Sequence, residues 1–184
     1  IMGNVAGGGA GGRVPEVSGR QAGDGGVAHG GGIHNDCTAS SRGTIIGAQV
    51  TVLGNRAQGG DAGSANDPSG CCSAAAGDGS GGGVFNAGIL ALDYSAIDSN
   101  QADAGELWEF IPYREADDSF GGGVRNVNQL TLRRSAVVNN SSGFGSGLSN
   151  SGVAVAENST FSGNRAQGQG SGIYNPSGIV TLTN

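Results

Sequence analysis

The sequence has little basic charge and no long apolar run, and each absence excludes a class of protein. Nine Arg and Lys residues stand against fifteen Asp and Glu, the net charge is −6, and no basic cluster is longer than the pair Arg133 and Arg134. A surface that follows nucleic-acid phosphates needs a basic patch, so we expect no DNA or RNA partner. No stretch approaches the roughly 20 apolar residues that cross a bilayer, and no signal-peptide pattern is present.

Cysteine and histidine are too few for the usual metal sites. The three cysteines are Cys37 and the adjacent pair Cys71 and Cys72. A disulfide from Cys37 to one of that pair would join two loops in an oxidising compartment, and it would leave one thiol over. His29, His34 and Cys37 lack the fourth ligand and the recognised spacing of a zinc site, so we expect no metal there.

Glycine, in contrast, is abundant, with 39 residues out of 184. Such a content indicates disorder or a fibrous protein unless the glycines are placed regularly. Here they belong to a repeat, because GGGVFN at 81–86 recurs as GGGIHN at 30–35, GGGVRN at 121–126, GSGLSN at 145–150 and GSGIYN at 170–175. A second block, ending in Asn, follows as VLGN at 52–55, IDSN at 97–100, VVNN at 137–140 and FSGN at 161–164. The chain is therefore predicted to be a folded repeat.

The spacing of these blocks predicts a solenoid. Asn126 and Asn150 lie 24 residues apart, and Asn150 and Asn175 lie 25 apart, which is about one coil of a three-sided parallel β-solenoid. Apolar residues recur at four positions per coil and would share one interior, which would be the main source of stability. One such column contains Ile33, Val84, Val124, Leu148 and Ile173.

The asparagines and glycines fall at the corners of the predicted coil, where positive φ or a close backbone approach is required. We expect two ladders of stacked asparagines with a structural role. The first contains Asn35, Asn86, Asn126, Asn150 and Asn175, and the second contains Asn4, Asn55, Asn100, Asn140 and Asn164. An outward column of Asp93, Arg133 and Glu157 is interpreted as a solvated face with alternating charge.

Four insertions interrupt the repeat, at residues 5–29, 36–41, 56–80 and 101–120, and three of them leave from the same corner. Loops that gather on one edge of a solenoid often form its binding surface. The insertion at 101–120 is rich in aromatic and acidic residues, which would suit a sugar or a protein partner. Its candidate binding residues are Trp108, Glu109, Phe110, Tyr113, Asp117 and Asp118. The alternative is that this insertion folds down to cover a side of the solenoid.

Enzyme motifs are missing from the sequence, since there is no Gly-x-Ser-x-Gly and no phosphate-binding Walker loop. The repeated Thr-x-Thr array of ice-binding proteins is also absent. The segments GDGG at 23–26 and GDGS at 77–80 only partly match calcium-binding glycine loops. We expect no catalytic residues and no cofactor, and calcium is the one ion that the sequence leaves open.

The blocks GGGVFN…IDSNQA, GSGLSN…NSTFSGNRA and GSGIYNPSGIVTLTN resemble the repeats of bacterial secreted and cell-surface right-handed parallel β-helix proteins. The polymorphic outer membrane proteins are a more distant likeness, since FSGN at 161–164 fits their Phe-x-x-Asn motif but their Gly-Gly-Ala-Ile block is absent. Both ends of the chain fall within a repeat, so we expect a fragment of a longer solenoid. The resemblance covers nearly all of the chain outside the three corner insertions.

This resemblance implies an extracellular or cell-envelope location and a non-catalytic role in structure, adhesion or assembly. The corner insertions, especially 101–120, would then bind a glycan or a protein partner within a larger surface assembly. The alternative is a polysaccharide lyase or glycoside hydrolase on the same fold. Such an enzyme needs clustered carboxylates or a basic residue on one sheet, whereas Asp93, Asp98, Arg133, Arg134 and Glu157 form no like-charged cluster in the predicted coils.

Overall fold

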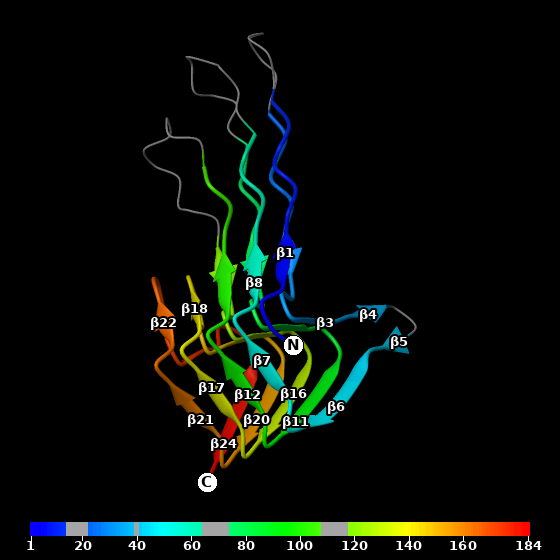
Figure 1. Cartoon of the computed structure of the whole chain (residues 1–184), viewed down its shortest axis with the longest axis vertical. Coiled ribbons are helices and arrows are strands. Elements are labelled where there is room, and N and C mark those ends of the chain that lie inside the picture. Colours follow the sequence, from blue (N-terminus) through cyan, green and yellow to red (C-terminus); the bar gives the residue numbers. More distant parts are fainter. Residues whose placement is uncertain (14–21, 39–40, 64–73, 108–117) are drawn as a thin grey trace.

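A computed structural model describes residues 1–13, 22–38, 41–63, 74–107 and 118–184, and in these residues the regular structure is all β (Figure 1). Four parallel sheets run along the molecule. Within each sheet, neighbouring strands come from successive coils of the chain. The predicted all-β parallel solenoid is confirmed. The right hand and the three sides of the coil remain predictions.

The strands are short and belong to six sheets. The first sheet contains β3 (Ile33–Asn35), β10 (Val84–Asn86), β15 (Val124–Asn126), β19 (Leu148–Asn150) and β23 (Ile173–Tyr174). The second contains β6 (Thr44–Ala48), β11 (Ile89–Asp93), β16 (Gln129–Arg133), β20 (Val153–Glu157) and β24 (Ile179–Thr183). The third contains β7 (Thr51–Leu53), β12 (Ala96–Asp98), β17 (Ala136–Val138) and β21 (Thr160–Ser162). The fourth contains β1 (Val5–Gly7), β8 (Arg56–Gln58), β13 (Gln101–Asp103), β18 (Ser141–Ser142) and β22 (Arg165–Ala166). A small parallel sheet contains β2 (Ala28–His29), β9 (Gly79–Ser80) and β14 (Ser119–Phe120), and β4 (Cys37–Thr38) with β5 (Ser41–Arg42) forms an antiparallel hairpin.

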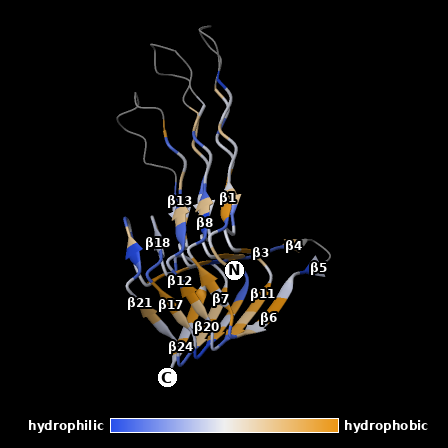
Figure 2. Cartoon of the chain, in the orientation of Figure 1, coloured by the Kyte–Doolittle hydropathy of each residue, from blue (hydrophilic) through white to orange (hydrophobic). Residues whose placement is uncertain are grey.

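The core consists of apolar side chains stacked in register on successive coils. Val84 pairs with Val124, which pairs with Leu148, and all three are at most 1 % exposed. Each aliphatic side chain buried in this way contributes about 1.5–3 kcal/mol. Figure 2 shows that apolar residues gather in the strands of the solenoid, whereas the described upper parts of the projecting segments are mostly neutral or hydrophilic.

Two asparagine ladders run along the solenoid beside this core, and their middle members are buried whereas Asn4 and Asn175 at the ends are exposed. The first joins Asn35, Asn86, Asn126, Asn150 and Asn175 through Nδ2–Oδ1 hydrogen bonds of 2.7–2.8 Å. The second joins Asn4, Asn55, Asn100, Asn140 and Asn164 through bonds of 2.9–3.0 Å. Each ladder satisfies buried polar groups at a corner where the backbone leaves one sheet for the next.

The corners require left-handed backbone conformations, as at Gly121 with φ +65° and Tyr94 with φ +46°. A Cβ added at Gly121 would lie 2.3 Å from the carbonyl oxygen of Val124, so only glycine fits there. Tyr94 and its equivalent Arg134 are exposed, and they hold the same conformation at a cost of roughly 1–2 kcal/mol each.

Three pairs of extended limbs leave the fourth sheet side by side and project from the solenoid (Figure 1). We name them the first arm (5–13 and 22–29), the second arm (56–63 and 74–80) and the third arm (101–107 and 118–120). Beyond their short strands the limbs bond at every third residue, as where Gly8 and Gly11 donate to Gln58 and Asp61, both at 2.8 Å. A repeat of three residues is that of the polyproline II helix and differs from the two-residue repeat of a β-strand.

Candidate functional site

The arms are held together by glycines that face one another. A Cβ added at Gly59 would lie 1.7 Å from the carbonyl oxygen of Gly77, and one at Gly8 would lie 1.8 Å from that of Gly26. The outward Gly9, in contrast, has no atom within 4 Å of an added Cβ. Inward glycines therefore let the limbs approach closely enough for backbone hydrogen bonds.

Carboxylates complete the contacts between the arms. Oδ1 of Asp24 accepts the N–H of Ala75 at 2.8 Å, and Oδ1 of Asp61 accepts the N–H of Glu106 at 2.9 Å. Asp24 belongs to the GDGG segment that partly matches a calcium loop, and the structure uses its carboxylate to join two arms. Among the described residues, no group of three or more His, Cys, Asp or Glu side chains could hold a metal ion.

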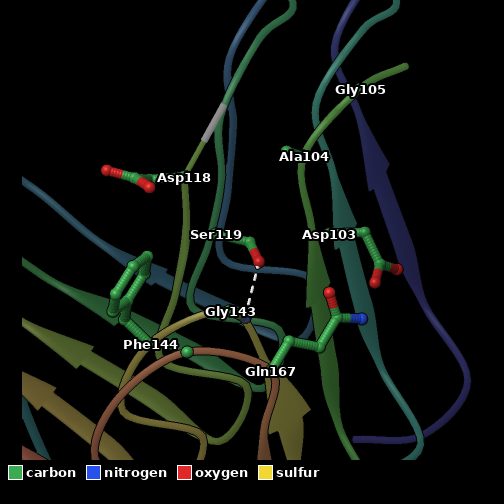
Figure 3. A pocket seen from close by; sticks show the side chains of 9 residues that line it. Asp103, Ala104, Gly105, Asp118, Ser119, Gly143, Phe144 and Gln167 are labelled. Atoms are coloured by element: carbon green, nitrogen blue, oxygen red, sulfur yellow. Dashed lines mark hydrogen bonds between the residues drawn. The ribbon is translucent and has the colours of Figure 1, made fainter. Parts of the chain in front are cut away.

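A hollow of about 390 Å³ lies beside the third arm, on the side away from the second (Figure 3). It forms because the next two coils close this corner within a few residues and carry no arm. Its lining contains Asp103, Ala104, Gly105, Asp118, Ser119, Gly143, Phe144, Gln167 and Gly168. This volume lies within the range of about 300–1,000 Å³ that is typical of ligand sites.

Ser119 fixes the floor of the hollow. Its Oγ accepts the N–H of Gly143 at 2.7 Å, as Figure 3 shows, and its carbonyl accepts the N–H of Phe144 at 2.8 Å. Gly168 then donates to the carbonyl of Gly143 at 2.8 Å. Since backbone and glycine make up much of this floor, an extended chain could approach it closely.

Asp103 and Asp118 are the two carboxylates of the lining, and they lie on opposite sides of the hollow (Figure 3). The Asp103 carboxylate is already bound, since it accepts from Nε of Arg56 at 2.7 Å and from Nε2 of Gln101 at 2.9 Å. The negative charge of Asp103 is thus balanced by Arg56 of the adjacent coil.

A row of aromatic side chains adjoins the hollow. The ring centroids of Phe120 and Phe144 lie 5.6 Å apart, and those of Phe144 and Tyr174 lie 5.4 Å apart. The guanidinium of Arg125 lies 5.0 Å from the Phe120 ring and donates to Oγ of Ser149 at 2.8 Å. Burial lowers the pKa of Arg125, and the nearby Tyr174 acts in the opposite direction. This row stacks coil upon coil and stiffens the base of the third arm.

The predicted binding residues are divided by what the structure describes. Asp118 lines the hollow, whereas Trp108, Glu109, Phe110, Tyr113 and Asp117 lie outside the described residues. The described limbs of this insertion run along the second arm, as where Gly105 donates to Gly77 at 2.9 Å, and do not fold down over a sheet. Cys37 is exposed, and its predicted partners Cys71 and Cys72 lie outside the described residues.

The outward charge column differs in detail from its prediction. Asp93, Arg133 and Glu157 are in register as expected, and Arg133 pairs with Glu157 at 2.9 Å. Asp93 instead pairs with Arg134, and this hydrogen bond raises the pKa of Arg134. The left-handed conformation at Arg134, with φ +46°, accompanies this choice of partner.

The sequence reasoning did not find Ala104, Ser119, Phe144 or Gln167, which line the hollow. The three-residue spacing of Gly8 and Gly11, Gly23 and Gly26, and Gly60 and Gly63 is a sequence signal for the packing of the arms but not for these four residues. No helix among the described residues is long and apolar enough to cross a membrane.

No protein-family model matches the chain, and searches of curated proteins and of solved structures found no match.

Proposed function

We propose that the chain is a non-catalytic β-solenoid module that acts in structure, adhesion or assembly at a cell surface or in the extracellular space. The solenoid would serve as the scaffold, and the corner with the three arms would bind the partner. The observation that carries this proposal is the open flank of the third arm, which lies over a hollow of about 390 Å³.

The placement of the charged residues also supports a binding role. Asp93 and Glu157 each pair with an arginine on the outer face, and Asp103 is bound by Arg56. Glycoside hydrolysis uses two carboxyl groups placed about 5–10 Å apart across the bond, and lyases use a basic residue beside the sugar carboxylate. The described lining of the hollow contains no Arg or Lys, and one of its two carboxylates, Asp103, is held in an ion pair by Arg56, which favours binding over catalysis.

The proposal is tested by incubating the purified chain with a panel of uronic-acid polymers and neutral glycans. We expect no new unsaturated or reducing ends, even after long incubation at high protein concentration. Turnover that is lost in Asp103→Asn or Asp118→Asn would overturn the non-catalytic assignment and favour the lyase or hydrolase alternative.

A further inference from the structure

The outgoing limbs of the arms donate backbone hydrogen bonds in one direction, from each arm to the next. The N–H of Gly59 in the second arm donates to the carbonyl of Asp103 in the third at 2.9 Å. Three residues further along, Ala62 donates to Glu106 at 3.0 Å. The first arm donates to the second in the same register, so this packing occurs twice within the molecule.

The third arm has the same row of backbone N–H donors along its edge, but no fourth arm follows it to supply the acceptors. Because Gln58 and Asp103 occupy equivalent positions, Ala104 is the equivalent of Gly59, and Leu107 is the equivalent of Ala62. Neither N–H donates to any acceptor in the described part of the chain. The hollow lies beside this edge, where a fourth limb would be expected.

We propose that a glycine-rich segment of a partner, in the polyproline II conformation, adds to this edge as a fourth limb and fills the hollow. The inference rests on the proposed binding function and names its partner chemistry. The partner's carbonyls would accept from Ala104 and Leu107, as those of Asp103 and Glu106 accept from the second arm. Addition of an extended peptide to an open backbone edge is an established mode of recognition.

Glycine is required at one position of that segment. A Cβ at Gly60 would lie 2.0 Å from the carbonyl oxygen of Gly9 in the first arm, and a Cβ at Gly105 would lie 2.0 Å from that of Gly60. Each limb thus places a glycine against the limb before it. A segment with any side chain at this position could not reach the edge of the third arm.

The test uses the chain's own second limb as the probe. A capped peptide of residues 56–63, RAQGGDAG, is titrated into the ¹⁵N-labelled protein. We expect saturable shifts of the Ala104 and Leu107 amide signals, together with those of Gly143 and Gly168. The control peptide carries alanine in place of Gly60, and its binding should be at least about tenfold weaker because of the contact with the backbone.

Two protein variants complete the test. Ala104→Pro removes the donor yet suits the polyproline II backbone, so it should abolish binding and leave the melting temperature nearly unchanged. Gln167→Trp, at an exposed position on the hollow, should block the peptide sterically. Equal binding of both peptides, full binding by both variants, or shifts confined to other surfaces would overturn the inference. None of these results would reveal catalysis, so this failure is distinct from failure of the proposed function.

Discussion

Asn86 and Asn126 lie one above the other on adjacent coils, and Nδ2 of Asn86 donates to Oδ1 of Asn126 at 2.7 Å. Both side chains are fully buried. Nδ2 of Asn86 also donates to the carbonyl of Gln129 at 2.7 Å, so the ladder ties each coil to the corner of the next. Removal of one asparagine leaves its neighbour's buried amide without a hydrogen-bond partner, and this lowers stability because the amide has lost its contact with water as well.

Asn126→Ala should therefore lower the free energy of unfolding by about 1–3 kcal/mol, which denaturant titration would measure. The matched control is Asn175→Ala, at the exposed end of the same ladder, where the loss should be much smaller. Equal losses at the two positions would show that the ladder does not stabilise the interior.

The inward and outward glycines of the arms should respond differently to the same substitution. Gly59→Ala brings a Cβ to 1.7 Å from the oxygen of Gly77, so the second arm should separate and its amides should exchange faster with solvent. Gly9→Ala meets nothing within 4 Å and should leave exchange unchanged or slightly slower. Identical exchange profiles in the two variants would contradict the packing described for the arms.

The solenoid should not depend on the third arm. Gln101 pairs with Ser141 and Phe120 lies beside Phe144, so replacing residues 101–120 with the Ser-Ser-Gly-Phe of 141–144 gives this coil the short corner of the next one. We expect a shift of only a few degrees in the melting temperature, because none of the described residues that are removed belongs to the main hydrophobic cluster and buried Ala102 is replaced by a serine of similar size.

The comparison is Leu130→Ala, a single substitution in the core. Leu130 is 2 % exposed, and its truncation should cost about 2–5 kcal/mol. If removal of the arm destabilises the protein more than this substitution, the arm is part of the folding core and does not merely project from it.

His29 gives the stability a dependence on pH. Its ring stacks on Phe85 with centroids 4.2 Å apart, and burial lowers its pKa below 6.5, with a further contribution from His34. The neighbouring Asp36 acts in the opposite direction, and Arg125 adds to the lowering. The unfolded chain therefore binds a proton more readily, so this contribution to stability is present above pH 6.5 and decreases as the pH falls below it.

The measurement is the free energy of unfolding at pH 7.5 and at pH 5.5 for the native chain and for His29→Phe, which keeps the stacked ring. The native chain should lose more stability on acidification than the variant. His34→Phe removes a smaller lowering contribution and leaves the burial of His29, so it should reduce the loss by less than His29→Phe does. A pH dependence that is the same in the native chain and in His29→Phe would contradict the assignment to His29.

The repeat was sufficient to predict the stacking of the coils. Val84 and Val124 occur at the same position of successive blocks, and because each coil reuses one backbone path, equal sequence position means spatial contact. The same logic places the asparagines of each ladder above one another. The sequence of each coil therefore predicts its own interior, because only certain residue types can occupy a buried position or a tight corner.

The arms and the hollow could not be predicted in this way. Contacts such as Gly59 with Gly77 join the two limbs of an insertion, and their three-residue repeat differs from that of the solenoid. The hollow depends on a difference between coils, namely that the third arm has no successor. No motif surrounds Ala104 in the sequence. Its N–H has no acceptor among the described residues because Ala104 lies on the last of the three stacked arms.

The most direct test compares the amide exchange of Gly59 and Ala104, which are equivalent positions on consecutive arms. The N–H of Gly59 is bonded to Asp103 at 2.9 Å, whereas that of Ala104 faces the open flank. After correction for intrinsic rates, we predict that Gly59 is protected about 100-fold or more relative to Ala104 in the isolated chain. Equal protection of the two amides would show that the third arm has no open edge, and the account of partner binding would be wrong.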